Sequence, residues 1–237
     1  MLCANIFYYL CRQNQPREMK IGIIVAMDKE FAQLQKVFGN DSNIVLQKCG
    51  IGKVNAAIGA TMMIEKHHPD VIISSGCAGG ADPSLNVGDV VVAMETTYHD
   101  AYCGDNCAYG QIMGMPKRYE LADKLIAIVQ QFGSDCHAIT MGLTVSGDWF
   151  VDSREKMREI MQHFPEAKAV DMESCSIAQV CYTFGVPFVS FRIISDVPLK
   201  DHKAEIYFDF WERLADGSFD VTYRFVERLQ QVGNVLK

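Results

Sequence analysis

The sequence predicts a single α/β domain in which a central twisted, mixed β-sheet is flanked by helices. Apolar runs of strand length alternate along the chain with amphipathic stretches of helix length. No internal repeat, low-complexity tract or Pro/Ser-rich linker divides the chain. Its 237 residues, 49% of them hydrophobic, suffice for one large core. We therefore expect an N-terminal extension over residues 1–18 and one domain over residues 19–237.

The first half of this domain is expected to alternate strands and helices. Strands are predicted over residues 20–26, 44–48, 70–75 and 87–97, and helices over residues 27–38 and after Gly52 through Met63. The glycine-rich segment 76–80 (GCAGG) is expected to be a turn after the third strand. Residues 98–116 form a long irregular segment rich in Gly, Tyr and Cys, and loops of this length in compact domains are often functional.

The second half repeats the same pattern. Helices are predicted over residues 121–132, 153–161, 172–184 and 208–229, and strands over residues 137–145 and 187–195. Ser153 is expected to cap its helix, because its hydroxyl can accept a hydrogen bond from a free amide of the first turn.

Polar residues gather just after the predicted strands, in segments 27–30, 76–80, 146–150 and 195–196. In open α/β sheets, ligands bind in the crevice outside the carboxyl ends of the strands. Four such segments would converge there, so the sequence predicts an active site at that edge.

Composition excludes several classes of function. The net charge of −7 argues against binding to a nucleic-acid backbone, and no apolar stretch reaches the roughly 20 residues of a membrane span. The nine cysteines are scattered without a disulfide framework, which indicates reduced thiols and a cytoplasmic protein. The histidines and the pair Cys103 and Cys107 lack a metal-binding spacing, so we expect no metal site.

Several acidic residues and glycines have both a structural and a functional interpretation. Glu30 and Glu173 open predicted helices, where the helix dipole alone favours carboxylates. Glu30 is the candidate general base, Glu173 could hold a pair of sugar hydroxyls, and Asp196 could protonate a leaving group. Gly50-Ile51-Gly52 partly matches a dinucleotide fingerprint, but Asn55 replaces its third glycine, and close helix packing explains the glycines as well.

Eight ordered segments resemble the 5′-methylthioadenosine/S-adenosylhomocysteine nucleosidases of the nucleoside phosphorylase/nucleosidase superfamily. They are KIGIIVAMDKE (20–30), CGIGKVNAAIGAT (49–61), PDVIISSGCAGG (69–80), VGDVVV (87–92), YHDA (98–101), VSGDWF (145–150), AVDMES (169–174) and VPFVSFRIISDV (186–197). The resemblance runs from about Met19 to the C-terminus. It implies a nucleoside phosphorylase-like fold and hydrolysis of the N-glycosidic bond of methylthioadenosine and S-adenosylhomocysteine, without a cofactor.

The resemblance also implies roles for individual residues. Glu30 would activate the attacking water, and Asp196, with Ser195 beside it, would protonate N7 of adenine. Met172 and Glu173 would hold the ribose. Phe150 would stack on the purine and the backbone of Val151 would contact the adenine edge, and the remaining substrate-binding candidates are Met27, Ile51, Cys77, Ala78, Gly79, Arg192 and, as an aromatic lid, Phe208.

The chain departs from the family pattern at a few positions. Cys77 replaces a usual serine, and Asp171 and Ser174 replace the commoner Glu and Ala. In the family, a neighbouring subunit lends apolar residues to the 5′-thio pocket, so the resemblance implies a homodimer. The corresponding segment, residues 101–107, has diverged, and the candidates for this contact are Tyr102, Tyr109 and Pro116.

Three alternatives remain open from the sequence. A nucleoside phosphorylase is one, although Glu30 would repel phosphate and Lys29 is the only nearby cation. A second is a hydrolase of a related adenine nucleoside such as aminodeoxyfutalosine, because residues 101–115 have diverged. The third is a dinucleotide- or nucleoside-binding module without catalysis.

Overall fold

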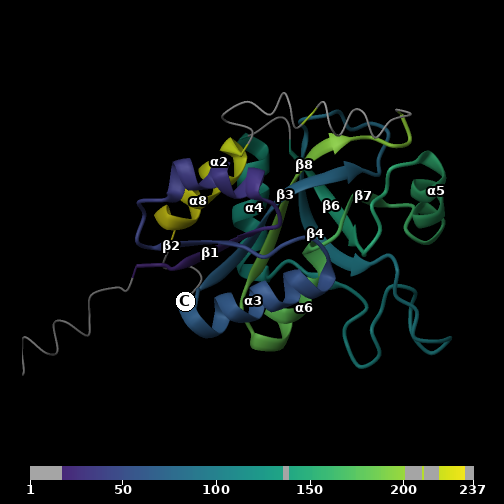
Figure 1. Ribbon diagram of the computed structural model, residues 1–237, viewed down its shortest axis with the longest axis horizontal. Coiled ribbons are helices and arrows are strands. Elements are labelled where there is room, and N and C mark those ends of the chain that lie inside the picture. Colours follow the sequence, from purple (N-terminus) through teal and green to yellow (C-terminus); the bar gives the residue numbers. More distant parts are fainter. Residues whose placement is uncertain (1–17, 136–138, 201–209, 211–218, 233–237) are drawn as a thin grey trace, which may run out of the picture.

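The computed structural model describes residues 18–135, 139–200, 210 and 219–232, and it forms a single α/β domain (Figure 1). A mixed, eight-stranded sheet lies at its centre and helices cover it, as the sequence predicts. The predicted N-terminal extension and Phe208 lie outside the described residues, except for Glu18 at the end of the extension.

The elements follow one another along the chain, and a long connection over residues 99–118 joins β4 to β5. Their bounds are β1 (Ile21–Val25), α2 (Asp28–Phe38), β2 (Ile44–Lys48), α3 (Lys53–His67), β3 (Val71–Gly80), β4 (Val90–Tyr98), β5 (Tyr119–Glu120), α4 (Asp123–Asp135), β6 (Ile139–Ser146), α5 (Arg154–His163), β7 (Ala167–Asp171), α6 (Ser174–Phe184), β8 (Phe188–Asp196) and α8 (Asp220–Gln231). The predicted cap of α5 is confirmed, because Ser153 Oγ accepts a hydrogen bond from the amide of Lys156 at 3.3 Å.

The sheet contains a closed circuit of strands. β1 pairs in parallel with β2 and β3, and β3 pairs in parallel with β8. β8 runs antiparallel to β4, which continues in parallel through β6 to β7. β7 then returns antiparallel to the end of β3, where Gly79 faces Val170 and Gly80 faces Ala169. The strands β3, β8, β4, β6 and β7 therefore form a small barrel, whose interior holds small and branched side chains.

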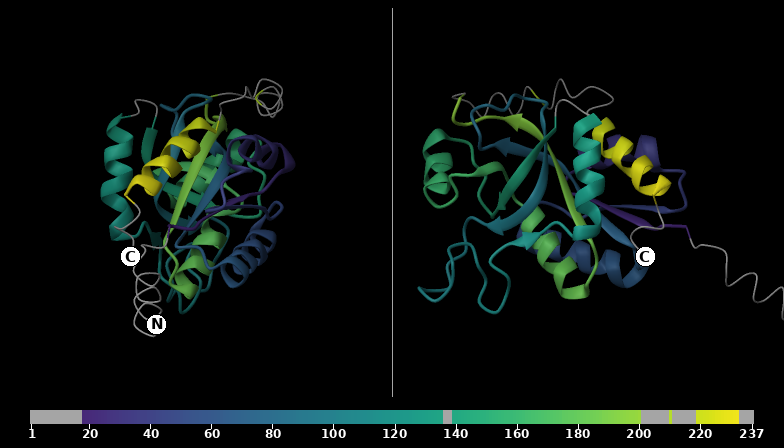
Figure 2. Two further views of the ribbon diagram at one scale, coloured as in Figure 1. Left: turned by 90° about the vertical axis from the view of Figure 1, so that its left-hand side faces the viewer. Right: turned by 180° about the vertical axis from the view of Figure 1, so that it is seen from behind.

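Helices cover this sheet in separate groups (Figures 1 and 2). α2, α4 and α8 pack on one face, where Phe132 and Phe225 contact Phe191 of β8. α3 and α6 pack together on the opposite face, and α5 covers the outer side of β6 and β7. Each large apolar side chain that is fully buried in these layers contributes about 1.5–3 kcal/mol to folding.

The glycine-rich segment 76–80 is a strand, so the predicted turn is wrong. β3 continues through Gly80, and its last residues close the barrel against β7. A Cβ on Gly80 would lie 3.1 Å from a methyl group of Val197, which shows how closely the chains approach. Because Gly79 and Gly80 have no side chains, the extended backbone of β3 can pack closely against its neighbours, and the chain does not turn here.

Two strands were not predicted. β5 has two residues, and β7 (AKAVD) lacks a long apolar run because it is short and lies at the barrel seam. The last predicted helix is described from Asp220 onward, as α8. Within the described part of the chain, no helix is long and apolar enough to cross a membrane.

Candidate functional site

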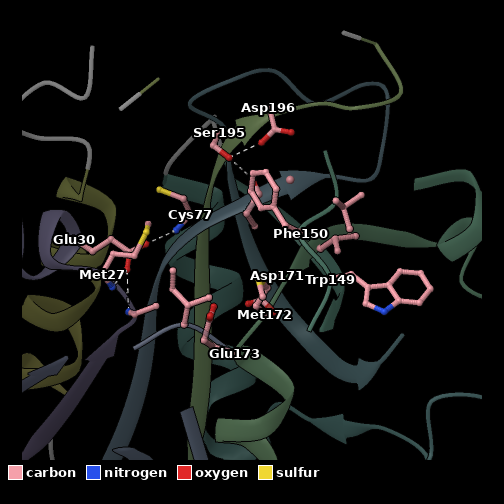
Figure 3. A pocket seen from close by; sticks show the side chains of 16 residues that line it. Met27, Glu30, Cys77, Trp149, Phe150, Asp171, Met172, Glu173, Ser195 and Asp196 are labelled. Carbon is pink, nitrogen blue, oxygen red and sulfur yellow. Dashed lines mark hydrogen bonds between the residues drawn. The ribbon is translucent and has the colours of Figure 1, made fainter. Parts of the chain in front are cut away.

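A pocket opens where β3, β7 and β8 end, next to the start of α2 (Figure 3). The residues that line it are Ala26, Met27, Glu30, Ile51, Cys77, Ala78, Gly79, Trp149, Phe150, Val151, Val170, Asp171, Met172, Glu173, Ser195 and Asp196. All described residues of the predicted site are among them, apart from Arg192.

Glu30 lies at one end of the pocket and is 2% exposed. One carboxylate oxygen accepts hydrogen bonds from the amides of Ala26 (2.9 Å) and Met27 (3.0 Å), and the other accepts from the amide of Cys77 (3.0 Å). Burial raises the pKa of the Glu30 carboxyl above its ordinary value of 4.5, and these amides and the charge of Arg192 oppose that rise. The Glu30 carboxyl group is thus fixed in place and has a raised affinity for a proton.

Gly76 leaves the space that Glu30 occupies. A Cβ at this position would lie 2.8 Å from Glu30 Oε1. We expect Gly76→Ala to displace the carboxylate from its amide donors and to lower kcat by about 10²-fold. The measurement is the steady-state rate of turnover. Gly88→Ala is the control, because nothing lies within 4 Å of a Cβ there, although its φ of +92° makes any side chain strained. Equal rates for Gly76→Ala and the wild-type protein would contradict the prediction that the position of the Glu30 carboxylate determines the rate.

Asp196 ends β8 at the other side of the pocket from Glu30 (Figure 3). The hydroxyl of Ser195 can donate to Asp196 Oδ1 at 2.7 Å or to the carbonyl of Ala78 at 3.2 Å. Asp196 Oδ2 lies 3.9 Å from the point that a Cβ of Gly79 would occupy. The serine thus orients one oxygen of the carboxyl group, while Oδ2 faces the glycine strand that lines the pocket.

Glu173 is the N-cap of α6 and is 8% exposed. Its Oε1 accepts a hydrogen bond from the amide of Gly52 at 2.9 Å. Gly52 has φ +93°, a conformation that glycine adopts without strain, so the Gly50–Gly52 turn serves to present this amide. Burial, together with the negative charge of Asp171, raises the pKa of Glu173 to about 7, and the charge of Arg192 opposes that rise.

The raised pKa of Glu173 predicts a pH-dependent loss of stability. The folded protein holds this proton more tightly than the unfolded chain, so the stabilisation is present below pH 4.5 and is lost as the pH rises to about 7. Glu173→Gln lacks this titration. We expect its free energy of unfolding, relative to wild type, to increase across that window by a value on the order of 3 kcal/mol. Urea denaturation of both proteins at several pH values is the measurement, and a constant difference would contradict the prediction.

Arg192 lies behind the pocket and not in its wall, with 2% exposure. Its Nε donates to Asp171 Oδ2 at 2.5 Å and its Nη2 donates to Ser74 Oγ at 2.7 Å. The guanidinium is therefore hydrogen-bonded to protein groups. This arrangement does not favour the predicted direct contact between Arg192 and a substrate.

Aromatic and apolar side chains form the remaining wall. Phe150 is 45% exposed and Ile51 is 51% exposed, so both present apolar surface at the open side of the pocket. Trp149 also lines it and stands edge-on to His99, with ring centroids 5.3 Å apart. A flat apolar surface beside carboxylates suits an aromatic base joined to a polar sugar.

Sequence reasoning did not assign Ala26, Trp149, Val170 and Asp171 to the site. Trp149 precedes Phe150, and Asp171 precedes Met172. Their position next to predicted site residues is the only feature of the sequence that could have indicated that they line the pocket. Val170 is part of β7, which was itself missed. Among the residues that the structure describes, no group of three or more His, Cys, Asp or Glu side chains could hold a metal ion.

Comparisons with known proteins identify the family of the chain. The family model described as the phosphorylase superfamily matches residues 20–229. A 5′-methylthioadenosine/S-adenosylhomocysteine nucleosidase from Exiguobacterium sp. is 39% identical over 235 residues, covering 90% of this chain and all of that protein.

Solved structures similar to this chain include proteins of the same name. A nucleosidase of this name from Streptococcus pneumoniae, with the transition-state inhibitor MT-ImmA, is 34% identical with a TM-score of 0.80, covering 89% of this chain and 100% of that one. The futalosine hydrolase of Helicobacter pylori is 29% identical with a TM-score of 0.80, covering 89% of this chain and 98% of that one. The chain therefore belongs to the 5′-methylthioadenosine/S-adenosylhomocysteine nucleosidase family, within the phosphorylase superfamily.

Proposed function

We propose that the protein hydrolyses the N-glycosidic bond of 5′-methylthioadenosine and S-adenosylhomocysteine, releasing adenine and the 5-thio-substituted ribose. The observation that carries this proposal is the presence of two carboxyl groups, Glu30 and Asp196, on opposite sides of one pocket (Figure 3). An acid and a base in different environments can divide the work of breaking one bond. The named relatives support the choice of substrates.

The proton transfers balance across these two residues. A water molecule attacks C1′ of the ribose while the bond from C1′ to N9 of adenine breaks. Glu30 takes a proton from the water, and Asp196 gives a proton to N7, so that adenine leaves as a neutral base. Positive charge develops on the ribose during the step. The ionised form of Glu173, which also accepts hydrogen bonds from the sugar hydroxyls, stabilises this charge.

The charges around the pocket favour water over phosphate as the nucleophile. None of the described residues that line it is Lys, Arg or His, whereas Glu30, Asp171, Glu173 and Asp196 are acidic. A phosphate ion would approach these carboxylates without a neutralising cation in the wall. This arrangement argues against the phosphorylase alternative.

Product analysis in the absence of phosphate tests the function. Purified protein is incubated with methylthioadenosine in a phosphate-free buffer, and the products are separated by chromatography. We expect adenine and free methylthioribose, at a rate that added phosphate does not increase. A strict requirement for phosphate, with a sugar 1-phosphate as product, would establish a phosphorylase instead.

A related adenine nucleoside remains the second candidate substrate. The similarity to the futalosine hydrolase of Helicobacter pylori and the diverged segment 101–115 both favour testing it. Turnover of aminodeoxyfutalosine and methylthioadenosine should be compared side by side. A larger kcat/KM for aminodeoxyfutalosine would overturn the proposed preference.

We infer that the protein acts as a cytoplasmic homodimer in methionine salvage. Val54, Ile58 and Met62 form an exposed apolar stripe on α3, at 71%, 53% and 57% exposure. Tyr182 and Phe184 of the adjacent α6 are also exposed, and large exposed apolar patches often mark contacts between proteins. Reduced thiols suit the cytoplasm, and the thio-substituted ribose retains the sulfur of methionine.

A charge in the α3 stripe tests the dimer. Ile58→Glu is expected to produce a monomer by light scattering and to reduce turnover, since the partner would complete the 5′-thio pocket. Glu65→Gln, an exposed change on the same helix, is the control. A wild-type protein that is monomeric at micromolar concentration, or an active monomeric variant, would contradict the inference.

A further inference from the structure

Arg192 is held rigidly behind the pocket by three partners. Besides its hydrogen bonds to Asp171 and Ser74, its Nη1 donates to the carbonyl of Phe191 at 3.2 Å. These contacts tie the guanidinium to β3, β7 and β8, the strands that carry the pocket. Its position is therefore determined by the protein and not by a ligand.

Asp171 is anchored equally well. Ser146 Oγ donates to its Oδ1 at 2.5 Å, and Ser174 Oγ donates to its Oδ2. Ser190 Oγ lies 2.7 Å from Ser174 Oγ and continues the network. Ser174 therefore donates to the same carboxylate oxygen that accepts from Arg192.

The Asp171–Arg192 pair lies close to both functional glutamates. A Cβ on Gly76 would be 2.8 Å from Glu30 Oε1 and 3.4 Å from Arg192 Nη1, so the base and the guanidinium approach the same point of β3. Glu173 follows Asp171 by two residues, at the start of α6. A single positive charge thus lies among three carboxylates in a buried environment, where charge interactions are strong.

We propose that the Asp171–Arg192 pair is a positioning element of the reaction: Arg192 favours the anionic forms of Glu30 and Glu173, and Asp171 fixes the guanidinium and limits its effect. The inference rests on the proposed hydrolysis and deepens it. Asp171 contributes to the pocket wall, but its oxygens are engaged by Ser146, Ser174 and Arg192. The pair therefore acts through the two glutamates and does not bind the substrate itself.

Other ionisable groups lie around the pair. They are the thiols of Cys49, Cys77 and Cys175 and the imidazole of His99. Burial raises the pKa of Cys49 to about 12 and those of the other two thiols well above 9.0, and it lowers the pKa of His99. Glu30 and Glu173 are the carboxyl groups of the pocket at which the charge of Arg192 opposes the rise in pKa that burial causes.

Opposite shifts of the pH–rate profile test the proposal. Activity should rise with pH as the two glutamates ionise. Asp171→Asn removes a negative charge, so the rise in activity should move to lower pH by about one unit. Arg192→Gln removes a positive charge, so the rise should move to higher pH by about one unit. Ser174→Ala changes no charge and is expected to leave the profile in place.

Variants that lose rate equally at every pH, with the rise at the wild-type position, would overturn the proposal. Should Asp171→Asn fail to fold, Arg192→Gln alone decides, because an unshifted profile contradicts a role for its charge. The double variant Asp171→Glu/Ser174→Ala retains the negative charge, so its activity should rise at the same pH as that of the wild-type protein. Adenine release by the wild-type protein in the same assay tests the proposed function separately, so the two failures are distinguishable.

Discussion

Replacing Glu30 by glutamine is expected to lower kcat for methylthioadenosine by about 10³-fold or more, while adenine binding remains measurable. A glutamine cannot take a proton from water. Its amide nitrogen would also face one or more of the three backbone amides that now donate to the carboxylate, from Ala26, Met27 and Cys77. The rate is measured by adenine release and the binding by calorimetry.

The matched control is Glu155→Gln, which changes an exposed carboxylate in the first turn of α5. It should retain the wild-type rate. Thermal unfolding of both variants separates loss of chemistry from loss of fold. A Glu30→Gln protein that is folded and hydrolyses the nucleoside at more than a tenth of the wild-type rate would remove Glu30 from the role of base.

Asp196→Asn is expected to lower kcat by about 10²- to 10⁴-fold, because asparagine can donate a hydrogen bond to N7 but cannot transfer a proton. The effect should be smaller on a nucleoside whose leaving group needs no protonation. Rates on methylthioadenosine and on a nitrophenyl riboside therefore measure the contribution of the acid directly.

Asp152→Asn provides the comparison for this variant, since Asp152 is an exposed residue close to the pocket that pairs with Lys156 at the surface. Its rate should not change. Ser195→Ala removes the hydroxyl that orients Asp196 and should have an intermediate effect. Equal losses for Asp196→Asn on both substrates would show that Asp196 does not act as the acid.

The sequence predicted most of the fold because strand and helix periodicities are local properties. Buried strands such as β1 and amphipathic helices such as α2 bury one continuous set of apolar side chains, which the residue pattern displays directly. The convergence of Glu30, Cys77, Phe150, Glu173 and Asp196 on one pocket also followed, since each lies near the end of a strand or the start of a helix.

What could not be predicted depends on contacts between distant segments. The glycines at 76–80 favour a turn locally, and only the pairing of Gly79 and Gly80 with β7 makes them a strand. Whether Arg192 reaches a ligand or a buried Asp171 is likewise decided by side-chain direction across β7 and β8, which residue spacing does not contain.

The source of the oxygen in the sugar product tests the central claim most directly. A single turnover of methylthioadenosine in ¹⁸O-labelled water with phosphate present, quenched before the sugar exchanges oxygen with solvent, is followed by mass spectrometry. A water molecule activated by Glu30 predicts one ¹⁸O atom in the methylthioribose and none in adenine. An unlabelled sugar, or a sugar phosphate as the first product, would contradict this account.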